Sequence, residues 1–224
     1  MSPKRIVEKA KVKMLDMIAI CDHNSAENVQ ATINAADSIN IKILPGMEIN
    51  SAEEVHMIAL FDEIDNAIRL QKKIYQHLSP GENDERLFGE QIIANEFDEV
   101  EGYNKRLLIT ATTLTLNDIV NTIHQFNGLA IASHIDRETY SIIGQLGFIP
   151  EDLKLDALEI SPNTNRDDAL KRFPEVAKYS LISSSDAHFL DDIGKATTSF
   201  LLEEPTLAEI KMALNSGNGR KIIT

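Results

Sequence analysis

Short apolar runs alternate with stretches of helical periodicity along most of this chain, and that alternation limits the possible folds more than any other feature. Strand-like runs occupy residues 16–20, 41–49, 55–61, 129–133, 155–160 and 181–185. Between or after them lie helical stretches at residues 26–38, 64–77, 116–126, 166–178 and 206–215. Strands that alternate with helices favour parallel βα units, with the helices covering the sheet. The sequence therefore predicts an α/β fold.

The same pattern argues for one domain over residues 1–224. We find no internal repeat, low-complexity tract or linker. The alternation fails only from residue 79 to about residue 106, where the sequence is polar and contains glycine. We interpret this segment as a flap-like insert that holds a short helix and a hairpin.

Charge limits the expected partners. The chain has 35 acidic and 22 basic residues, a formal net charge of -13. Such a field repels polyanions, and nonspecific duplex binding depends on Lys and Arg neutralising phosphates. We therefore expect no duplex nucleic acid partner. A small anionic substrate would need a strong local positive charge, which bound divalent cations can supply.

Cysteine content and hydropathy bear on the compartment. Cys21 is the only cysteine, so an internal disulfide is excluded and a reducing compartment is permitted. No N-terminal apolar stretch is typical of a signal peptide, and no run approaches the ~18 apolar residues of a membrane span. These features predict a cytoplasmic protein without a membrane partner.

Four of the six histidines, His23, His56, His134 and His188, fall at or beside the strand-like runs, together with Glu48 and Asp186. The carboxyl ends of strands in α/β folds converge on one face, where sites are built. Asp186 and His188 are two residues apart and can point to the same side. Imidazole with carboxylate suits zinc, manganese or iron. A lone histidine at such a place is more often a hydrogen-bonding group, so the joint pattern carries this prediction. His77 and His124 lie in helical stretches and are interpreted as ordinary packing or surface residues.

Five segments resemble the motifs of the PHP (polymerase and histidinol phosphatase) family: Ile18-Ala19-Ile20-Cys21-Asp22-His23-Asn24, Pro45-Gly46-Met47-Glu48-Ile49, Glu54-Val55-His56-Met57-Ile58-Ala59, Ala132-Ser133-His134 and Ser184-Ser185-Asp186-Ala187-His188. Singly these motifs are weak, but five in order along the chain are specific. The resemblance implies a distorted seven-stranded (βα) TIM-like barrel with two or three divalent metals. It also implies hydrolysis of a phosphomonoester or phosphodiester, often of a nucleotide, by metal-activated hydroxide.

The resemblance also implies roles for single residues. By position, Glu48 would bridge two metals, and His56 and His134 would complete the second metal's ligands. Asp186 would bind the first metal, while His23 and His188 would bind the third. His188 or His134 is the candidate for protonating the leaving oxygen. Arg137 is a candidate phosphate clamp, although a solvated loop arginine is an equal alternative.

One departure from the family pattern has consequences for fold and activity. The family opens with a strand ending in His-x-His, and no such segment precedes Ser2-Pro3 here. The resemblance then implies a barrel without its first strand. It also implies that only the metal site formed by Glu48, His56 and His134 keeps all of its protein ligands. We expect either a chain that begins at an internal methionine, which the intact remaining ligands favour, or a naturally reduced variant. Unpaired strand edges further predict an opened barrel, lower stability or self-association.

Two other functions stay open at this point. The missing motif favours a noncatalytic binding or regulatory domain, whereas the surviving ligands favour an enzyme. An amidohydrolase-type metal hydrolase on a related barrel is the third possibility. That class lacks support because no lysine stands at a plausible bridging position.

Overall fold

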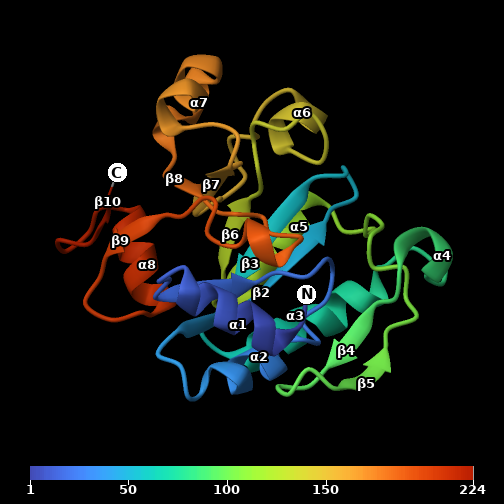
Figure 1. Cartoon of the computed structure of the whole chain (residues 1–224). Coiled ribbons are helices and arrows are strands. Elements are labelled where there is room, and N and C mark those ends of the chain that lie inside the picture. The colour runs from blue at the N-terminus through green and yellow to red at the C-terminus, as the bar shows by residue number, and fades with distance from the viewer. Residues whose placement is uncertain (224) are drawn as a thin grey trace.

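The computed structural model describes residues 1–223, and its centre is a six-stranded sheet with the strand order β1-β2-β3-β6-β7-β8 (Figure 1). The strands are β1 (Met17–Ile20), β2 (Lys42–Asn50), β3 (His56–Leu60), β6 (Leu129–Ala132), β7 (Ala157–Ile160) and β8 (Leu181–Ser183). Within residues 1–223 no strand joins β1 to β8, so the sheet is a curled half-barrel with two edges. The predicted α/β fold of TIM-like type is confirmed.

Helices cover the sheet and fill most of the intervals predicted for them. They are α1 (Pro3–Val12), α2 (Val29–Ala36), α3 (Ile64–Gln76), α5 (Leu116–Gln125), α6 (Ile142–Leu146), α7 (Arg166–Arg172) and α8 (Leu207–Leu214), with 3₁₀ turns η1 (Pro174–Lys178) and η2 (Leu190–Asp192). The predicted helix at 166–178 is two elements, because Pro174 disfavours helical backbone at Phe173 and cannot donate a helical hydrogen bond. None of the described helices is both long and apolar enough to span a bilayer.

The strands are not all parallel, which corrects the expectation of parallel βα units. β3 is antiparallel to both β2 and β6, whereas the β1–β2, β6–β7 and β7–β8 pairs are parallel. Only residues 51–55 separate β2 from β3. A parallel crossover needs a dozen or more residues, so this connection can only form a hairpin.

β2 lies between β1 and β3. Its residues 42–45 pair with β1, its residues 46–50 pair with β3, and Glu48 also pairs with His23 just beyond β1. At the start of the pairing with β3 stands Gly46, where an added Cβ would lie 2.7 Å from Cys21 Sγ and 2.9 Å from the Ile20 carbonyl oxygen. The backbones of β1 and β2 can therefore approach this closely only because residue 46 has no side chain.

One face of the sheet carries apolar residues at one end and polar residues at the other. Leu44, Leu60 and Leu129 pack against the apolar residues of α8. Side chains two apart in a strand lie on the same face. Glu48 is four residues beyond Leu44 in β2, so it lies on this face as well. The opposite end of the face is thus left for a polar site.

The segment at residues 79–106 contains the short helix and hairpin that the sequence predicted, as α4 (Glu85–Phe88), β4 (Ile92–Ala94) and β5 (Val100–Tyr103). It packs onto the start of α2, where the Asn28 side chain bonds the backbones of Ile92 and Ala94. Its action as a flap, and the assignment of the chain to one domain, stay predictions.

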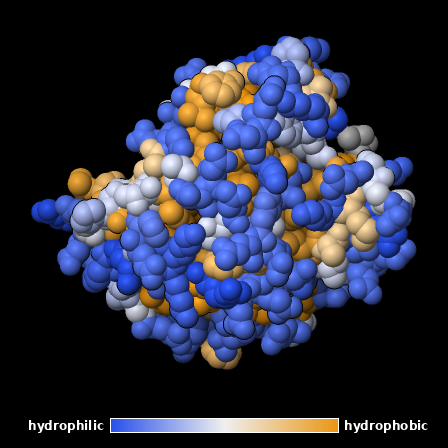
Figure 2. All heavy atoms as spheres, turned by 180° about the vertical axis from the view of Figure 1, so that it is seen from behind, coloured by the Kyte–Doolittle hydropathy of each residue, from blue (hydrophilic) through white to orange (hydrophobic). Residues whose placement is uncertain are grey.

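The remaining strands form a separate pair. β9 (Ser199–Leu201) is antiparallel to β10 (Lys221–Ile223), a strand that the sequence did not reveal. Seen from behind, the surface of the molecule is mostly hydrophilic with scattered apolar areas (Figure 2).

Candidate metal centre

The six predicted site residues lie at one edge of the sheet. Glu48 is within β2, His23 follows β1, His134 follows β6, and Asp186 and His188 follow β8. His56 is instead the first residue of β3. Because β3 is antiparallel, its amino end lies where the parallel strands have their carboxyl ends. His56 therefore lies beside the others because of the direction of β3, and not because it ends a parallel strand.

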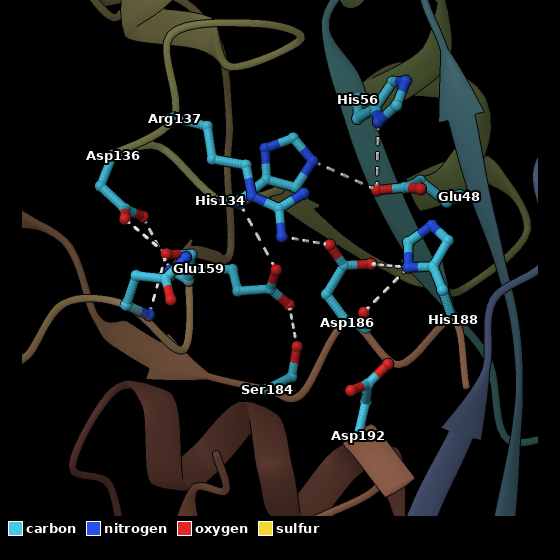
Figure 3. A network of polar contacts seen from close by, with 12 residues as sticks. Glu48, His56, His134, Asp136, Arg137, Glu159, Ser184, Asp186, His188 and Asp192 are labelled. Carbon is cyan, nitrogen blue, oxygen red and sulfur yellow. Dashed lines mark hydrogen bonds and ion pairs between the residues drawn. The ribbon is translucent and has the colours of Figure 1, made fainter. Parts of the chain in front are cut away.

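Glu48 is the centre of this group. Its Oε2 lies 3.2 Å from His23 Nδ1, while its Oε1 lies 3.4 Å from His56 Nδ1 and 3.6 Å from His134 Nε2. The Glu48 and His134 side chains are 9% and 3% exposed. Figure 3 shows Glu48 between the rings of His56 and His134, with Asp186 and His188 close by. A single buried carboxylate therefore faces three imidazoles.

These separations fit ligands of a metal ion. Two ligand atoms about 2.1 Å from one tetrahedral ion lie about 3.4 Å apart, which matches the three nitrogen–oxygen distances at Glu48. The ligand atoms of His23, Glu48 and His56 all lie within 4.8 Å of one another. His134 Nδ1 is buried without a hydrogen-bond partner in residues 1–223. Buried polar atoms of this kind are rare, so this nitrogen is a polar group that the described chain does not satisfy.

Backbone contacts fix Glu48 beside the loop that holds His23. The Glu48 amide donates to the Asp22 carbonyl over 3.1 Å, and the Glu48 carbonyl accepts from the Asn24 amide over 2.8 Å. Asn24, fully buried, also donates through its side chain to the carbonyls of Leu108 and Thr110. The loop after β1 is thus locked in register with β2.

Asp186 and His188 form the outer part of the group. Arg137 Nη2 lies 2.6 Å from Asp186 Oδ2, and His188 Nδ1 lies 3.0 Å from the Asp186 carbonyl oxygen. The rings of His188 and His23 are 6.3 Å apart. His188 is the most open of the group, with its side chain 62% exposed. Arg137 therefore contacts a predicted ligand directly, and its role as a phosphate clamp stays a prediction.

Two of these residues have strained backbones. His134 has φ of 30° and Asp186 has φ of 43°, in the left-handed region that non-glycine residues rarely adopt. Such strain costs on the order of 1–3 kcal/mol and gathers at functional sites. It turns both side chains out of their strand directions, toward the group around Glu48.

The local electrostatics favour the charge states that bind metals. Burial raises the pKa of Glu48, but hydrogen bonds from His134 and His56 and the charges of His56 and His23 outweigh it, and the pKa lies well below its ordinary value. Burial lowers the pKa of His23, against an opposing effect of Glu48. The centre thus favours an ionised carboxylate and a neutral His23 imidazole, and metal ligation needs both forms.

Glu159 of β7 belongs to the same centre but was not predicted. Its carboxylate accepts from the His134 amide over 3.4 Å and from the Ser184 hydroxyl, so it joins the ends of β6 and β8. Burial, together with the charges of Glu48 and Asp186, raises the pKa of Glu159 to about 7, although the Ser184 hydrogen bond lowers it. An acid inside the apolar run at 155–160 was the sequence signal that could have identified it.

The raised pKa of Glu159 predicts a pH effect on the metal-free protein. A carboxyl group whose folded pKa exceeds its unfolded value near 4.5 makes the fold less stable as pH rises from about 4.5 to 7. Glu159→Gln should remove the loss of stability that Glu159 causes over this pH range. Urea unfolding midpoints from pH 4.5 to 8 measure this loss. Exposed Glu151, changed to Gln, is the control. Parallel wild-type and Glu159→Gln curves would contradict the prediction.

Tyr140 is a second contact that the sequence did not indicate. Its ring stacks on His56 with 4.6 Å between centroids, and its carbonyl oxygen accepts from the His56 amide over 2.9 Å. The Tyr140 backbone has φ of 57°. Tyr140 therefore contacts one face of the His56 ring and also bonds its backbone.

Solved structures share this fold. The chain matches endonuclease Q from Pyrococcus furiosus, a lesion-specific endonuclease, at 20% identity and a TM-score of 0.73, over 99% of this chain and 53% of that one. It matches an endonuclease Q complex with a 27-mer duplex at 19% identity and a TM-score of 0.74, with the same coverage. A candidate metal-dependent phosphoesterase from Bifidobacterium adolescentis matches at 16% identity and a TM-score of 0.58, over 96% of this chain and 91% of that one. The chain thus spans about half the length of the endonuclease Q chains.

The expectation that a duplex nucleic acid partner is excluded is wrong. A protein with this fold holds a duplex with an abasic lesion at its active site. Net charge sums over the whole surface, whereas the local field around a site decides which ligands approach it. The charge of -13 therefore does not exclude duplex DNA.

Family models cover most of the chain. Comparison with curated proteins finds no match to the sequence. The PHP domain model, in contrast, matches residues 1–149, and the PHP-associated model matches residues 171–218. The first match includes His23, Glu48, His56 and His134, and the second includes Asp186 and His188. Solved structures similar to this chain include PHP-like metal-dependent phosphoesterases. The chain therefore belongs to the PHP domain family.

Proposed function

We propose that this protein hydrolyses a phosphoester, as a phosphomonoesterase or phosphodiesterase, with divalent zinc, manganese or iron held around Glu48. The observation that carries the proposal is the position of the Glu48 carboxylate. Its Oε2 lies 3.2 Å from one imidazole nitrogen, and its Oε1 lies 3.4 Å and 3.6 Å from two others. A carboxylate surrounded in this way suits a bridge between two cations. A nucleotide is one candidate substrate.

We assign the ligands by their position around that bridge. His56 and His134 both face Glu48 Oε1 and would hold one cation together with it. His23 faces Oε2 and, with His188 beyond it, forms a second region, to which Asp186 contributes. The cations, when bound, would supply Lewis-acid activation of water and of the phosphate.

The protein's own groups have separate tasks in this mechanism. Glu48 and Asp186 provide negative charge that holds the cations. We assign proton donation to the leaving oxygen to His188, which is exposed at the mouth of the site, with buried His134 as the second candidate. Arg137 would orient Asp186, which it contacts, and would bind a phosphate oxygen with the remaining N–H groups of its guanidinium.

Arg137→Gln is expected to weaken metal binding by about 10- to 100-fold, because partners that orient metal ligands contribute on that scale. Arg137→Lys should restore only part of this, since it keeps the charge but loses the planar fork. Metal titration followed by turnover at saturating metal would measure both effects. Unchanged metal affinity with a higher KM would assign Arg137 to substrate alone.

The proposal is tested by metal analysis and turnover. Purified protein is loaded with Zn²⁺, Mn²⁺ or Fe²⁺, its bound metal is counted, and hydrolysis of 4-nitrophenyl phosphate and bis(4-nitrophenyl) phosphate is followed. His134→Asn should lose metal and turnover, whereas His77→Asn, a histidine on the far end of α3, should keep both. Bound metal without hydrolysis of either ester would favour a noncatalytic binding domain.

A further inference from the structure

The N-terminal helix region has a charge opposite to the rest of the molecule. Residues 1–14 contain five bases and one acid, while the remaining chain contains 17 bases and 34 acids. The bases are Lys4, Arg5, Lys9, Lys11 and Lys13. A local positive field therefore exists on a protein whose net charge is strongly negative.

Three of these bases form one row along the loop that follows the predicted ligands Asp186 and His188. Arg5, Lys9 and Lys13 are four residues apart, so they share one side of the helix and its C-terminal turn. Lys9 Nζ lies 2.8 Å from Asp191 Oδ1, and the Lys13 side chain lies against Gly194, 3.2 Å from where its Cβ would be. Arg5 lines an open cleft of about 680 Å³ that His188 and Phe189 also line. The row thus leads to the mouth of the candidate metal centre.

Most of this positive charge is free to meet a ligand. Lys9 is paired with Asp191, but Lys4, Arg5, Lys11 and Lys13 make no ion pair within residues 1–223, and all four are exposed. Asp98 and Asp191 also line the cleft, and Asp191 is the partner of Lys9 in the middle of the row. A phosphate would therefore compete with Asp191 for Lys9, whereas Arg5 and Lys13 have no ion pair in the described residues and are cations that phosphates can neutralise.

An exposed aromatic side chain stands at the same place. Phe189 directly follows His188 and is 74% exposed. Its amide donates to Asp192 Oδ2 over 3.0 Å, its carbonyl accepts from the Asp192 amide over 2.9 Å, and Lys195 Nζ lies 2.6 Å from Asp192 Oδ1. The backbone is therefore fixed, and the ring is held outward in a position suited to stacking.

We propose that the row Arg5, Lys9 and Lys13 binds the phosphate backbone of a nucleic acid strand, and that Phe189 stacks on a base beside the metal centre. This inference rests on the proposed function, because it names a polynucleotide as the substrate class of the same site. Eight residues of helix span about 12 Å, and one strand of a duplex has a phosphate every ~3.4 Å along its axis. The row can therefore meet about three or four consecutive phosphates.

A nucleic acid fits this surface better than an anionic membrane does. The apolar side of α1 is already buried through Pro3, Val7 and Ala10, so the helix cannot insert it between lipids. The row also leads to groups proposed to act on a phosphoester. Duplex and single-stranded substrates share the backbone chemistry that the row would recognise, so the experiment has to separate them.

The test measures binding of metal-loaded protein to a fluorescent 20-nucleotide single strand and to its duplex, by anisotropy from 20 to 300 mM KCl. We expect the triple variant Arg5→Gln, Lys9→Gln, Lys13→Gln to bind more weakly and to lower the salt slope by about 2 on single strands or about 3 on duplex. The matched control changes Lys72, Lys154 and Lys221 to Gln on other elements and should bind like wild type. The form that wild type binds more tightly at the same salt concentration, and whose binding the triple variant weakens, is the preferred substrate.

Phe189 is tested in the same assay. Phe189→Ala should weaken single-strand binding on the order of 5- to 150-fold, the range for one stacked base, and Phe189→Tyr should restore it. Quenching of a 2-aminopurine placed in the strand would report the stacking itself. A merely structural Phe189 would leave that quenching unchanged in both variants.

Several outcomes overturn the inference. These are no oligonucleotide binding by wild type, an unchanged slope in the triple variant, or binding to phosphatidylserine vesicles in place of oligonucleotides. Hydrolysis of the small esters is read separately on the same wild-type preparation. Oligonucleotide binding without ester hydrolysis contradicts the proposed function alone, and hydrolysis without binding contradicts the nucleic acid surface alone.

Discussion

Glu48→Gln is expected to lower phosphoester hydrolysis by more than about 100-fold and to remove bound metal. Partners that only orient ligands already contribute about 10- to 100-fold, and Glu48 lies within ion-pair distance of His23, His56 and His134 together. The amide keeps the size of the side chain but loses the charge that pairs with cations. Metal content by mass spectrometry and kcat/KM at saturating metal measure the two losses.

The same variant separates ligand loss from unfolding. Cations that bind only the folded state stabilise it by about 2.7 kcal/mol at a hundredfold excess over Kd. Wild type should therefore gain thermal stability when metal is added, whereas Glu48→Gln should not. His77→Asn is the control and should behave as wild type. A Glu48→Gln protein that keeps its metal and its turnover would exclude Glu48 as the bridge.

Gly46→Ala is expected to reduce the free energy of unfolding by about 1–3 kcal/mol, the usual cost of forcing atoms into a packed interior. The new Cβ would lie 2.7 Å from Cys21 Sγ, 2.9 Å from the Ile20 carbonyl and 3.2 Å from the Ala59 carbonyl. Two of these atoms are backbone in the neighbouring strands, so β1, β2 or β3 has to move. Urea unfolding measures the change.

Moving these strands should also reach the metal centre. Glu48 is two residues beyond Gly46, and His23 is two residues beyond Cys21, so a shift between β1 and β2 changes the distance between the two ligands. We expect weaker metal binding in Gly46→Ala even under conditions where the variant is fully folded. Gly217→Ala, whose Cβ would have only the Met212 carbonyl at 3.6 Å, is the matched control. Equal unfolding energies for the two variants would refute the strand-contact explanation.

Part of the site followed from local patterns. Apolar runs ending in His23, His134 and the Asp186–His188 pair predicted residues at one edge of a sheet, and Figure 3 shows His134, Asp186 and His188 close to Glu48. This works because strand ends in α/β folds converge whatever the side chains between them. The polar insert at 79–106 was also predictable, since its composition cannot form a buried element.

Other features of the site required contacts between distant segments. The direction of β3, which brings His56 to the site, follows from the hairpin after β2. The ion pair of Arg137 with Asp186, 2.6 Å long, joins residues 49 positions apart. The pKa of Glu159 of about 7 arises from its burial and from the charges of Glu48 on β2 and Asp186 in the loop after β8. No periodicity in a single sequence encodes such pairings.

The sequence by itself determined the alternation of strands and helices, the polar insert and the identity of the acids and imidazoles at the strand ends. These are local properties, set by side-chain period and type. The tertiary structure alone decided which oxygen of Glu48 faces which ring, and which bases of α1 lie along the loop beyond His188. Those relations depend on strand direction, register and packing between segments far apart in the chain, and net charge gave the wrong expectation about DNA for the same reason.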